Sequence, residues 1–452
     1  MRELFGTDGI RGKANEYPMT ADVALNVGKA VAYVFKNDHH RPRIVVGRDT
    51  RVSGHLLEHA IVSGICSMGV DAIRVGTMTT PGIAYLSWSV RADAGIIITA
   101  SHNPFEDNGI KIFGGDGYKL SDEKEEMIED YIFSPEKLTQ AYPPPKDLGK
   151  ASILDDARGL YIGFLKSIFP KELKLGGMKI ALDCANGAAY KIAPQVFYEL
   201  GAEVESLFIN PNGKNINKDC GSQHVDTLKE TVVQENMDIG LAFDGDADRL
   251  IAVDEKGNKL TGDQIIAICA NDLKERGKLP NNKVVTTKMS NYGFRIAMKE
   301  LGIDNLITKV GDRYVLEKMK EEGAVIGGEE SGHIIFLEHH TAGDGILTAI
   351  QLLRIMKQKN KPLSELAKIM EVYPQKLMNV RVKEKPDLES LQEVQKVIEN
   401  VEQELTDRGR VLVRYSGTQP LCRVMVEART KVETEKYCKK ITDVIRASEI
   451  AE

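Results

Sequence analysis

The sequence has no long apolar segment. None of its runs approaches the roughly 18 consecutive apolar residues that a membrane-spanning helix needs. The N-terminal segment MRELFGTDGIRG also lacks the apolar core of a signal peptide. We therefore expect a cytoplasmic protein that makes no contact with a membrane.

Closely spaced cysteine pairs are missing as well. Zinc and redox sites commonly use a CxxC spacing, and small secreted proteins use dense cysteines for disulfides. The sequence has six cysteines, and none of them stands in such a pair: Cys66, Cys184, Cys220, Cys269, Cys422 and Cys438. This spacing argues against a zinc site and a disulfide framework, and it favours reduced thiols.

A large excess of charge of one sign is also missing. The formal net charge of −6 is small for 452 residues, so nothing indicates a nucleic acid or an acidic membrane as partner. Hydrophobic residues make up 42% and charged residues 28%, a balance typical of soluble proteins with a buried core. Because one hydrophobic core serves roughly 100–200 residues, we expect three or four domains. The small net charge makes a small molecule the expected ligand.

Three segments of the sequence repeat one pattern of strand, helix and strand. The first reads RIVVGRDTR, HLLEHAIVSGICSMGV and DAIRVG; the second begins with KIALDCANGAA and has a helix that ends at Gly201; the third begins with KVVTTKMSN and has a helix that ends at Gly302. Glycine at the end of a helix between two β-rich runs is typical of a βαβ unit with parallel strands. The sequence therefore predicts three similar α/β domains with mixed, mainly parallel sheets.

Each repeat then reaches an apolar run that ends in an unusual polar loop. GIIITA precedes SHNP, DIGLAF precedes DGDADR, and GAVIGG precedes EESGH. Ligands of open α/β sheets gather beyond the carboxyl ends of the strands. We therefore expect the three loops to occupy equivalent places and to face one central cleft.

Proline-rich and polar junctions divide the chain into four expected domains. Candidate linkers are AYPPPKDLG, VDEKGNKLTGDQ and MEVYPQK. The tail departs from the repeat, with VRVKEK, a helix over 387–407, the strands RVLVRY and CRVMVEART, and a last helix, which together indicate a C-terminal α+β domain. The predicted domains are 1–150, 151–255, 256–371 and 372–452.

The loop DGDADR is a candidate metal site. Its alternating carboxylates, Asp244, Asp246 and Asp248, can converge on a hard cation. An EF-hand has the same initial spacing, but it needs glycine at its sixth position, where this chain has Arg249. A solvated acidic turn is the remaining alternative, and the apolar strands on both sides of the loop make it the weaker one.

The loop TASHNP offers a nucleophile. Ser101 stands beside His102 at the end of an apolar strand, and Lys111 follows in the segment DNGIK. A serine nucleophile needs an activating base or a charged partner, which these neighbours can provide. An ordinary turn is the alternative, because serine and asparagine are common in turns.

Two further loops have residues suited to a phosphosugar. GEESGH contains Glu329, Ser331 and His333, which suit hydrogen bonds to sugar hydroxyls and proton transfer, although a helix N-terminus is the alternative. In the tail, RYSGTQP and the residues after it combine arginine side chains, hydroxyls and open backbone N–H groups, which bind phosphate well. A plain hairpin turn is the alternative there. The residues of this second group are Arg414, Ser416, Gly417, Thr418 and Arg423.

Taken in order, these motifs resemble the α-D-phosphohexomutase superfamily over essentially the whole chain. The resemblance rests on LFGTDGIRG, GRDTR, TASHNP, DNGIK, DGDADR, GEESGH and RYSGTQP. Within the superfamily, DCANGAAY, KVGDRYVLEKM and GGEESGHIIFLEHHTAGDGILTAIQLL are more similar to the phosphoglucosamine mutase branch than to phosphomannomutase/phosphoglucomutase. The tail motif more commonly reads RxSGTEP with Pro before Ser, and here Tyr415 and Gln419 stand at the places of that Pro and of Glu. Glu330 stands where Gln, Asn or Met is common.

The resemblance implies roles for the residues in these motifs. Ser101 is expected to be phosphorylated, and its phosphate and the three aspartates of DGDADR are expected to hold one Mg²⁺ per chain. The expected catalytic residues around them are His102, Lys111, Arg249 and His333. The expected substrate-binding residues are Thr7, Arg11, Arg48, Glu329, Ser331, Arg414, Ser416, Gly417, Thr418 and Arg423.

The implied reaction interconverts glucosamine 6-phosphate and glucosamine 1-phosphate. It passes through phospho-Ser101 and a hexosamine or hexose 1,6-bisphosphate that turns round in the cleft. Three alternatives stay open: a phosphomannomutase/phosphoglucomutase, a metal-dependent phosphatase, and a non-catalytic protein that binds a sugar phosphate or calcium. The expected partner is a small phosphosugar, and a homodimer is possible.

Overall fold

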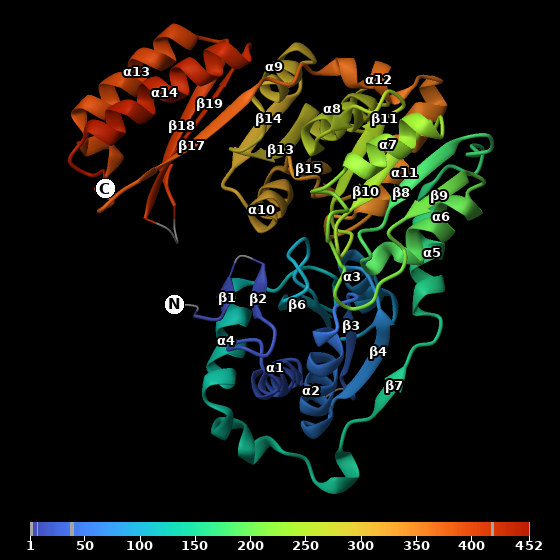
Figure 1. The fold of residues 1–452 in the computed structure, drawn as a ribbon. Coiled ribbons are helices and arrows are strands. Elements are labelled where there is room, and N and C mark those ends of the chain that lie inside the picture. The colour runs from blue at the N-terminus through green and yellow to red at the C-terminus, as the bar shows by residue number, and fades with distance from the viewer. Residues whose placement is uncertain (1–2, 7, 37–39, 417–419, 452) are drawn as a thin grey trace. The chain divides into compact units, whose positions relative to one another are not determined.

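The computed structural model describes residues 3–6, 8–36, 40–416 and 420–451 (Figure 1). The chain forms two compact units. The first comprises Met1–Met289 and Ile303–Ile369, and the second comprises Ser290–Gly302 and Met370–Glu452. None of the helices in the described part of the chain has the length and apolar character of a membrane span.

The N-terminal sheet belongs to the first unit and has the strand order β1-β2-β6-β5-β3-β4-β7. Its strands are β1 (Phe5–Gly6), β2 (Gly9–Lys13), β3 (Arg43–Arg48), β4 (Asp71–Thr77), β5 (Ala94–Ile98), β6 (Asp107–Gly114) and β7 (Ala151–Ile153). Its helices are α1 (Ala21–Val34), α2 (Ser53–Ser67), α3 (Thr80–Ser89) and α4 (Asp122–Phe133).

Helices cover both faces of the N-terminal sheet, because the side chains of its strands point alternately to one face and the other. Ile44 and Val46 of β3 share a core with Leu57 and Ile61 of α2. On the other face, Ile83 of α3 lies against backbone positions of β3 and β5. Side chains two residues apart in a strand point to the same face, so with helices on both faces every residue of the central strand β5 is buried.

Two further sheets in the first unit follow the same plan. The second has the order β12-β11-β10-β8-β9 and the third the order β14-β13-β15-β16. The strands are β8 (Lys179–Asp183), β9 (Glu203–Leu207), β10 (Ile239–Phe243), β11 (Leu250–Asp254), β12 (Lys259–Leu260), β13 (Lys283–Thr287), β14 (Asp304–Thr308), β15 (Ile326–Gly328) and β16 (Ile334–Phe336). The further helices of the first unit are α5 (Ala157–Ile168), α6 (Ile192–Glu199), α7 (Asp226–Gln234), α8 (Gly262–Glu275), α10 (Asp312–Glu322), α11 (Gly345–Lys359) and α12 (Leu363–Leu366), whereas α9 (Tyr292–Glu300) belongs to the second unit.

The three sheets repeat one topology, which confirms the predicted repeats. The shared orders are β4-β3-β5-β6, β9-β8-β10-β11 and β14-β13-β15-β16. In each, the first three strands are parallel and the fourth is antiparallel to the third. Each polar loop singled out in the sequence joins the third strand to the fourth. The loops are therefore equivalent, as predicted, and the sheets are mixed.

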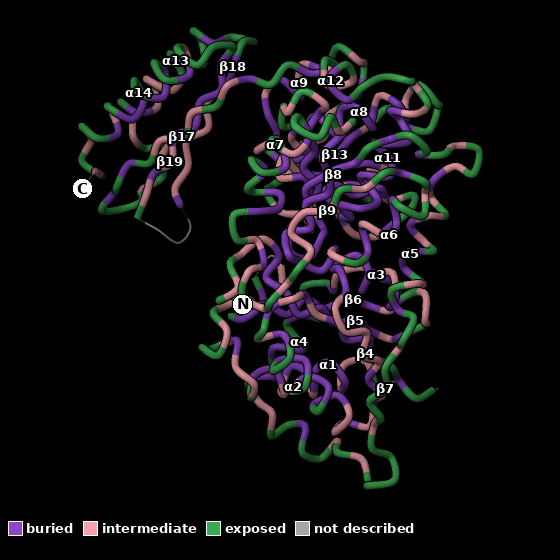
Figure 2. The backbone as a smooth tube through the Cα atoms, turned by 45° about the vertical axis from the view of Figure 1, so that its right-hand side comes forward, coloured by how far each residue is buried: buried purple, intermediate pink, exposed green. Residues whose placement is uncertain are grey.

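Strands that lead into or out of the three polar loops are the most deeply buried part of the first unit. Every residue of β5, β10, β11, β15 and β16 is buried, and Figure 2 shows the tube purple through the middle of the sheets. Strands covered on both faces have continuous apolar sequences, as in AGIII and IGLAF. Loops that leave such strands are anchored at both ends in rigid core.

The second unit is a smaller α+β domain, as predicted. Its antiparallel sheet has the order β17-β19-β18, with β17 (Gln375–Arg381), β18 (Gly409–Tyr415) and β19 (Leu421–Ala428). The helices α13 (Gln392–Leu405) and α14 (Lys431–Ala447) pack on this sheet. The sequence placed the start of α13 at Asp387, but Pro386 and a short 3-10 turn over Leu388–Ser390 delay it to Gln392.

Candidate active site

The loop that contains Ser101 begins directly after β5. The backbone of Ser101 is left-handed, with φ 52°, and its N–H donates to Thr99 Oγ1 at 3.0 Å. Its hydroxyl donates to Asp244 Oδ2 at 2.6 Å, across to the equivalent loop of the second repeat. The Ser101 side chain is buried, so the loop presents a single hydroxyl in a fixed position.

Arg51 anchors the Ser101 loop through hydrogen bonds to its backbone. Its guanidinium is completely buried and donates to Asp49 Oδ2 at 2.9 Å. The other donors reach four backbone carbonyls of the loop, those of Ser101 at 3.0 Å, Asn103 at 2.8 Å, Asp107 at 3.1 Å, and Pro104. A guanidinium has five N–H donors, and all five are used here.

We expect Arg51→Lys to loosen this loop and to destabilise the N-terminal domain. An ammonium has three donors, so at least two of the five buried acceptors would lose their partner, at a cost of about 3–5 kcal/mol. Thermal unfolding and the extent of Ser101 phosphorylation measure the effect. The control is Arg43→Lys, because the exposed Arg43 also bonds backbone carbonyls, those of Val90 and Arg91. An Arg51→Lys protein as stable and as phosphorylated as this control would contradict the assignment.

The second loop joins β10 to β11 and contains the aspartate triad. Carboxylate oxygens of Asp244, Asp246 and Asp248 lie within 4.8 Å of one another, and all three residues are buried. The backbone of Ser101 can approach this second loop closely because residue 245 is glycine. A Cβ there would lie 2.5 Å from the carbonyl oxygen of Ser101. The structure therefore places the serine hydroxyl at the edge of a compact carboxylate cluster.

The cluster has the features of a cation site. Burial, followed by the charges of Asp248 and Asp246, raises the pKa of Asp244 well above its usual value. Among the described residues, nothing donates a hydrogen bond to Oδ1 of Asp246 or to Oδ1 of Asp248, although both atoms are buried. Buried carboxylate oxygens without donors are costly, and hard divalent cations prefer such ligands. The residues present therefore fit a divalent cation.

Lys111 on β6 adds positive charge beside the triad. Its ammonium lies 3.1 Å from Asp246, 3.4 Å from Asp248 and 3.0 Å from Asp8. Burial opposes the charge, but Asp246 and Asp8 outweigh it and raise the pKa of Lys111 well above its usual value. Arg249 also faces the cluster, with its backbone N–H 3.2 Å from Asp244 Oδ1 and its side chain 3.7 Å from Asp248 Oδ1.

Two histidines flank the cluster. His102 Nδ1 lies 3.3 Å from Ser101 Oγ, and burial, followed by Arg249 and Arg11, lowers the pKa of His102 to about 4. His333 Nδ1 lies 3.6 Å from Asp248 Oδ2, and its Nε2 lies 3.6 Å from Asp312 Oδ2. Burial opposes a charge on this ring, but Asp248 outweighs it and raises the pKa of His333 to about 9.

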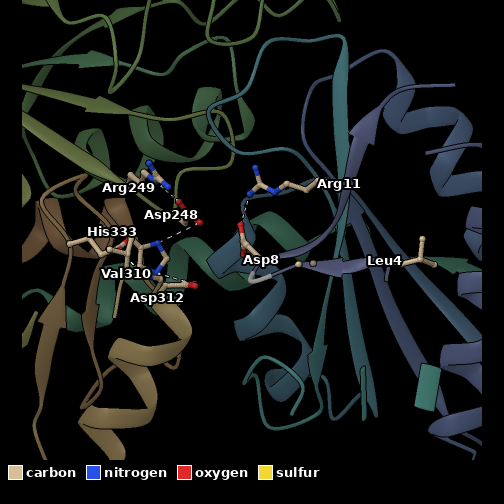
Figure 3. Close-up of a pocket in the computed structure, with 12 residues that line it drawn as sticks. Leu4, Asp8, Arg11, Asp248, Arg249, Val310, Asp312 and His333 are labelled. Atoms are coloured by element: carbon tan, nitrogen blue, oxygen red, sulfur yellow. Dashed lines mark hydrogen bonds and ion pairs between the residues drawn. The ribbon is translucent and has the colours of Figure 1, made fainter. Parts of the chain in front are cut away.

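A cavity of about 490 Å³ opens beside these groups, lined by loops of all three repeats (Figure 3). Asp8, from the turn between β1 and β2, and Arg11 of β2 face Asp248, Arg249 and His333. The cavity is of the size of small-molecule sites, which occupy about 300–1,000 Å³. Its lining residues are Leu4, Gly6, Asp8, Gly9, Arg11, Asp248, Arg249, Val310, Gly311, Asp312, Glu329 and His333.

The third loop, between β15 and β16, contributes Glu329 to the cavity. Glu329 Oε1 accepts a hydrogen bond from the N–H of Gly311 at 3.1 Å. The loop turns at Gly332, whose φ is 92° and where a Cβ would lie 2.2 Å from the carbonyl oxygen of Leu250. Ser331 lies in the same turn, and its buried hydroxyl bonds to none of the described residues. The third loop therefore packs directly on the start of β11, where the second loop ends.

The expected substrate-binding residues lie in different places. Arg11 and Glu329 line the cavity, whereas Arg48 bonds Glu58 at 3.1 Å, the carbonyl of Asp49 at 3.1 Å and Thr77 at 3.4 Å. In the second unit, Arg414 of β18 stands directly opposite Arg423 of β19. The N–H of Ser416 donates to the carbonyl of Leu421 at 2.8 Å. Thr7, Gly417 and Thr418 lie outside the described residues.

Several residues of the site were missed from the sequence alone. Asp8 pairs with Lys111 and with Lys119, and Lys119 also pairs with Asp312 across to the third repeat. Asp8 and Arg51 stand inside the recognised motifs GTDG and GRDTR, so their motifs were a usable signal. Lys119 and Asp312 are distant in sequence, and only the fold brings them together.

Models of four protein-family domains match the chain in order. Phosphoglucomutase/phosphomannomutase alpha/beta/alpha domains I, II and III match residues 2–139, 160–257 and 261–373, and the C-terminal domain matches residues 377–444. The phosphoglucosamine mutase of Syntrophus aciditrophicus is 62% identical over 446 residues, which cover 99% of both chains. That of Syntrophobacter fumaroxidans is 57% identical over 448 residues, 99% of this chain and 100% of the other. The chain therefore belongs to the phosphoglucomutase/phosphomannomutase family of phosphohexomutases.

Solved structures share the same fold at low sequence identity. A phosphoglucomutase/phosphomannomutase family protein from Burkholderia thailandensis superposes with a TM-score of 0.79 at 23% identity, covering 99% of this chain and 98% of the other. The N-acetylphosphoglucosamine mutase of Aspergillus fumigatus, in complex with GlcNAc-6P and magnesium, gives a TM-score of 0.66 at 18% identity, with 98% and 96% covered. At these identities the likeness is one of fold.

Proposed function

We propose that this protein interconverts glucosamine 6-phosphate and glucosamine 1-phosphate through a phosphorylated Ser101. The observation that carries the proposal is the 2.6 Å hydrogen bond between Ser101 and Asp244, which joins a nucleophile on one repeat to a cation site on another. Relatives at 62% and 57% identity over nearly the full length are phosphoglucosamine mutases, which supports the choice of sugar.

The proposed cycle conserves phosphate. Phospho-Ser101 transfers its phosphoryl group to the free hydroxyl of the bound monophosphate, which breaks the serine O–P bond and leaves glucosamine 1,6-bisphosphate. The bisphosphate turns round in the cleft. Its other phosphoryl group then returns to Ser101, and the isomeric monophosphate leaves.

The triad and phospho-Ser101 are the proposed ligands of one Mg²⁺. The donor-free Oδ1 atoms of Asp246 and Asp248 support this assignment, as does the choice of carboxylates, which Mg²⁺ prefers. When bound, the ion supplies charge neutralisation at the transferring phosphoryl group.

The chain's own cations surround the same atoms. Phosphoryl transfer spreads negative charge over the equatorial oxygens, so fixed positive groups stabilise its transition state. Lys111 and Arg249 border the triad, and Arg11 lines the adjoining cavity. His102, Lys111 and His333 adjoin the reacting position, and these three are the proposed carriers of the hydroxyl proton.

Glu329 and Ser331 are the proposed contacts to the sugar. Glu329 lines the cavity, and the buried Ser331 hydroxyl has no partner among the described residues, so both have hydrogen-bonding capacity for a ligand. Parallel assays with glucosamine, glucose and mannose 6-phosphates test the preference. A higher kcat/KM for mannose or glucose 6-phosphate would favour the alternative phosphomannomutase/phosphoglucomutase.

A ³¹P NMR assay tests the reaction itself. The full-length protein is incubated with Mg²⁺, glucosamine 6-phosphate and a trace of a hexose 1,6-bisphosphate. We expect glucosamine 1-phosphate to appear with no inorganic phosphate. Release of inorganic phosphate would indicate a phosphatase, and an unchanged spectrum would indicate a protein that only binds the sugar phosphate or calcium.

Arg414 and Arg423 are proposed to bind the substrate phosphate, together with Ser416, Gly417 and Thr418. We expect Arg414→Gln to raise KM for glucosamine 6-phosphate roughly 10–100-fold, because one charge-assisted hydrogen bond is worth about 1.5–3 kcal/mol. The matched control is Arg446→Gln on α14, an arginine with a half-exposed side chain. Steady-state kinetics measure both variants. Equal KM values in the two would rule out a phosphate contact at Arg414.

We propose a division of the chain into four domains. We assign the phosphoserine loop to a domain of residues 1–150, the metal loop to 151–255, the sugar loop to 256–371 and phosphate binding to 372–452. We also propose a cytoplasmic enzyme, and a homodimer that light scattering can test.

A further inference from the structure

Thr80, the first residue of α3, contacts the aspartate triad from the first repeat. Its hydroxyl donates to Asp246 Oδ2 at 2.6 Å. Its backbone N–H donates to the carbonyl oxygen of Asp246 at 3.0 Å. Both donors of one buried residue therefore hold one residue of the metal loop, which lies in a different repeat.

These contacts determine which carboxylate oxygen Asp246 presents to the cluster. Oδ2 receives the Thr80 hydroxyl and, at 3.1 Å, the ammonium of Lys111. Oδ1 is buried and accepts no hydrogen bond from any described residue. The carboxylate therefore cannot rotate without breaking two hydrogen bonds, and its donor-free oxygen stays available to a cation.

Thr80 is itself held rigidly. The preceding Thr79 caps α3 by accepting from Gly82 N at 3.0 Å. His340 of the third repeat bonds the carbonyl of Pro81 at 3.0 Å. One turn further along α3, Tyr85 stacks on Phe164 of α5 with ring centroids 4.3 Å apart. The start of α3 is therefore fixed by packing and hydrogen bonds on several sides, so it can serve as a rigid reference for the metal loop.

We infer that Thr80 is a positioning residue for the divalent cation: its hydroxyl orients the Asp246 carboxylate so that Oδ1 faces the ion. The inference rests on the proposed function in one respect, the assignment of Asp246 as a metal ligand. Hydrogen bonds to the unused oxygen of a ligating carboxylate typically contribute 10–100-fold to metal affinity. Thr80 touches neither substrate nor ion and acts through Asp246.

Calorimetric titration of the full-length, metal-free protein with Mn²⁺ and with Mg²⁺ tests the inference. We expect Thr80→Val to weaken binding about 10–100-fold, because valine keeps the shape but loses the hydroxyl. Thr80→Ser keeps the hydroxyl and should bind nearly as the wild type does. Where Thr80→Val fails to fold, Thr80→Ala removes the same hydroxyl without placing a methyl group against the carboxylate.

The control is Thr348→Val, which removes another buried threonine hydroxyl, one that donates to the carbonyl of Asp344 at 2.7 Å. Its metal affinity should equal that of the wild type. Wild-type affinity in Thr80→Val or Thr80→Ala would overturn the inference, as would a Thr80→Ser protein as impaired as Thr80→Val. A wild-type protein that binds neither ion would instead refute the proposed metal site.

Discussion

Ser101→Ala should lose at least about 10⁴-fold in mutase activity, a loss typical of removing a nucleophile. The reason is chemical, because alanine has no oxygen to hold the phosphoryl group between the two half-reactions. The variant should also stay unmodified after incubation with a hexose 1,6-bisphosphate, whereas the wild type gains the mass of one phosphoryl group. Coupled kinetics and intact-protein mass spectrometry measure the two effects.

The control for this substitution is Ser63→Ala, on the exposed side of α2. Ser63 Oγ bonds the carbonyl of His59 at 2.8 Å and lies outside the cavity lining. It should keep full activity and a full adduct. A phosphoryl adduct that persists in Ser101→Ala would mean that another residue is the carrier.

Asp246→Asn should reduce activity about 10³-fold and abolish stabilisation by Mg²⁺. Asparagine keeps the shape of the side chain, but it removes one of the negative charges that favour a divalent cation and leaves Lys111 with a weaker partner. A ligand that binds only the folded state adds about 2.7 kcal/mol at 100 times its Kd. The wild type should therefore unfold at a higher temperature when Mg²⁺ is added, and the variant should not.

Asp226→Asn is the matched control for the charge change. Asp226 begins α7, and its side chain is 91% exposed. The control should respond to Mg²⁺ as the wild type does. Equal Mg²⁺ stabilisation of Asp246→Asn and the wild type would show that the triad does not hold the metal ion.

The fold could be predicted well because the sequence repeats its local signals. Leu57, Ile61 and Ile65 form the buried face of α2, and the strands AGIII and IGLAF are apolar throughout because both sheet faces are covered. The repeated order of elements also placed the three polar loops at equivalent strand ends. Boundaries were less accurate, as at α13, where a short turn after Pro386 delays the helix start.

The sequence could predict those parts of the site whose residues lie close together within one loop. The close approach of Asp244, Asp246 and Asp248 follows from their spacing along one loop. Thr80 could not be found in this way, because its partner Asp246 lies 166 residues further along the chain. Such contacts depend on how the repeats pack on one another, which local patterns do not encode.

The motif GRDTR illustrates the same difficulty within a few residues. Its two arginines, Arg48 and Arg51, have the same chemistry, and the resemblance directed attention to Arg48. In the structure, Arg48 pairs with Glu58, whereas Arg51 donates four hydrogen bonds to the Ser101 loop and a fifth to Asp49. Arg48 is the last residue of β3 and Arg51 follows in the next turn, and only the fold determines which partners each reaches.

Transfer of a labelled phosphoryl group tests the proposed mechanism most directly. The full-length protein is labelled at Ser101 with a radioactive hexose 1,6-bisphosphate, separated from free ligand, and mixed with unlabelled glucosamine 6-phosphate and Mg²⁺. We predict that the label leaves the protein and appears in glucosamine phosphates, with none in inorganic phosphate. Label that stays on the protein, or that leaves as inorganic phosphate, would contradict a mutase that works through phospho-Ser101.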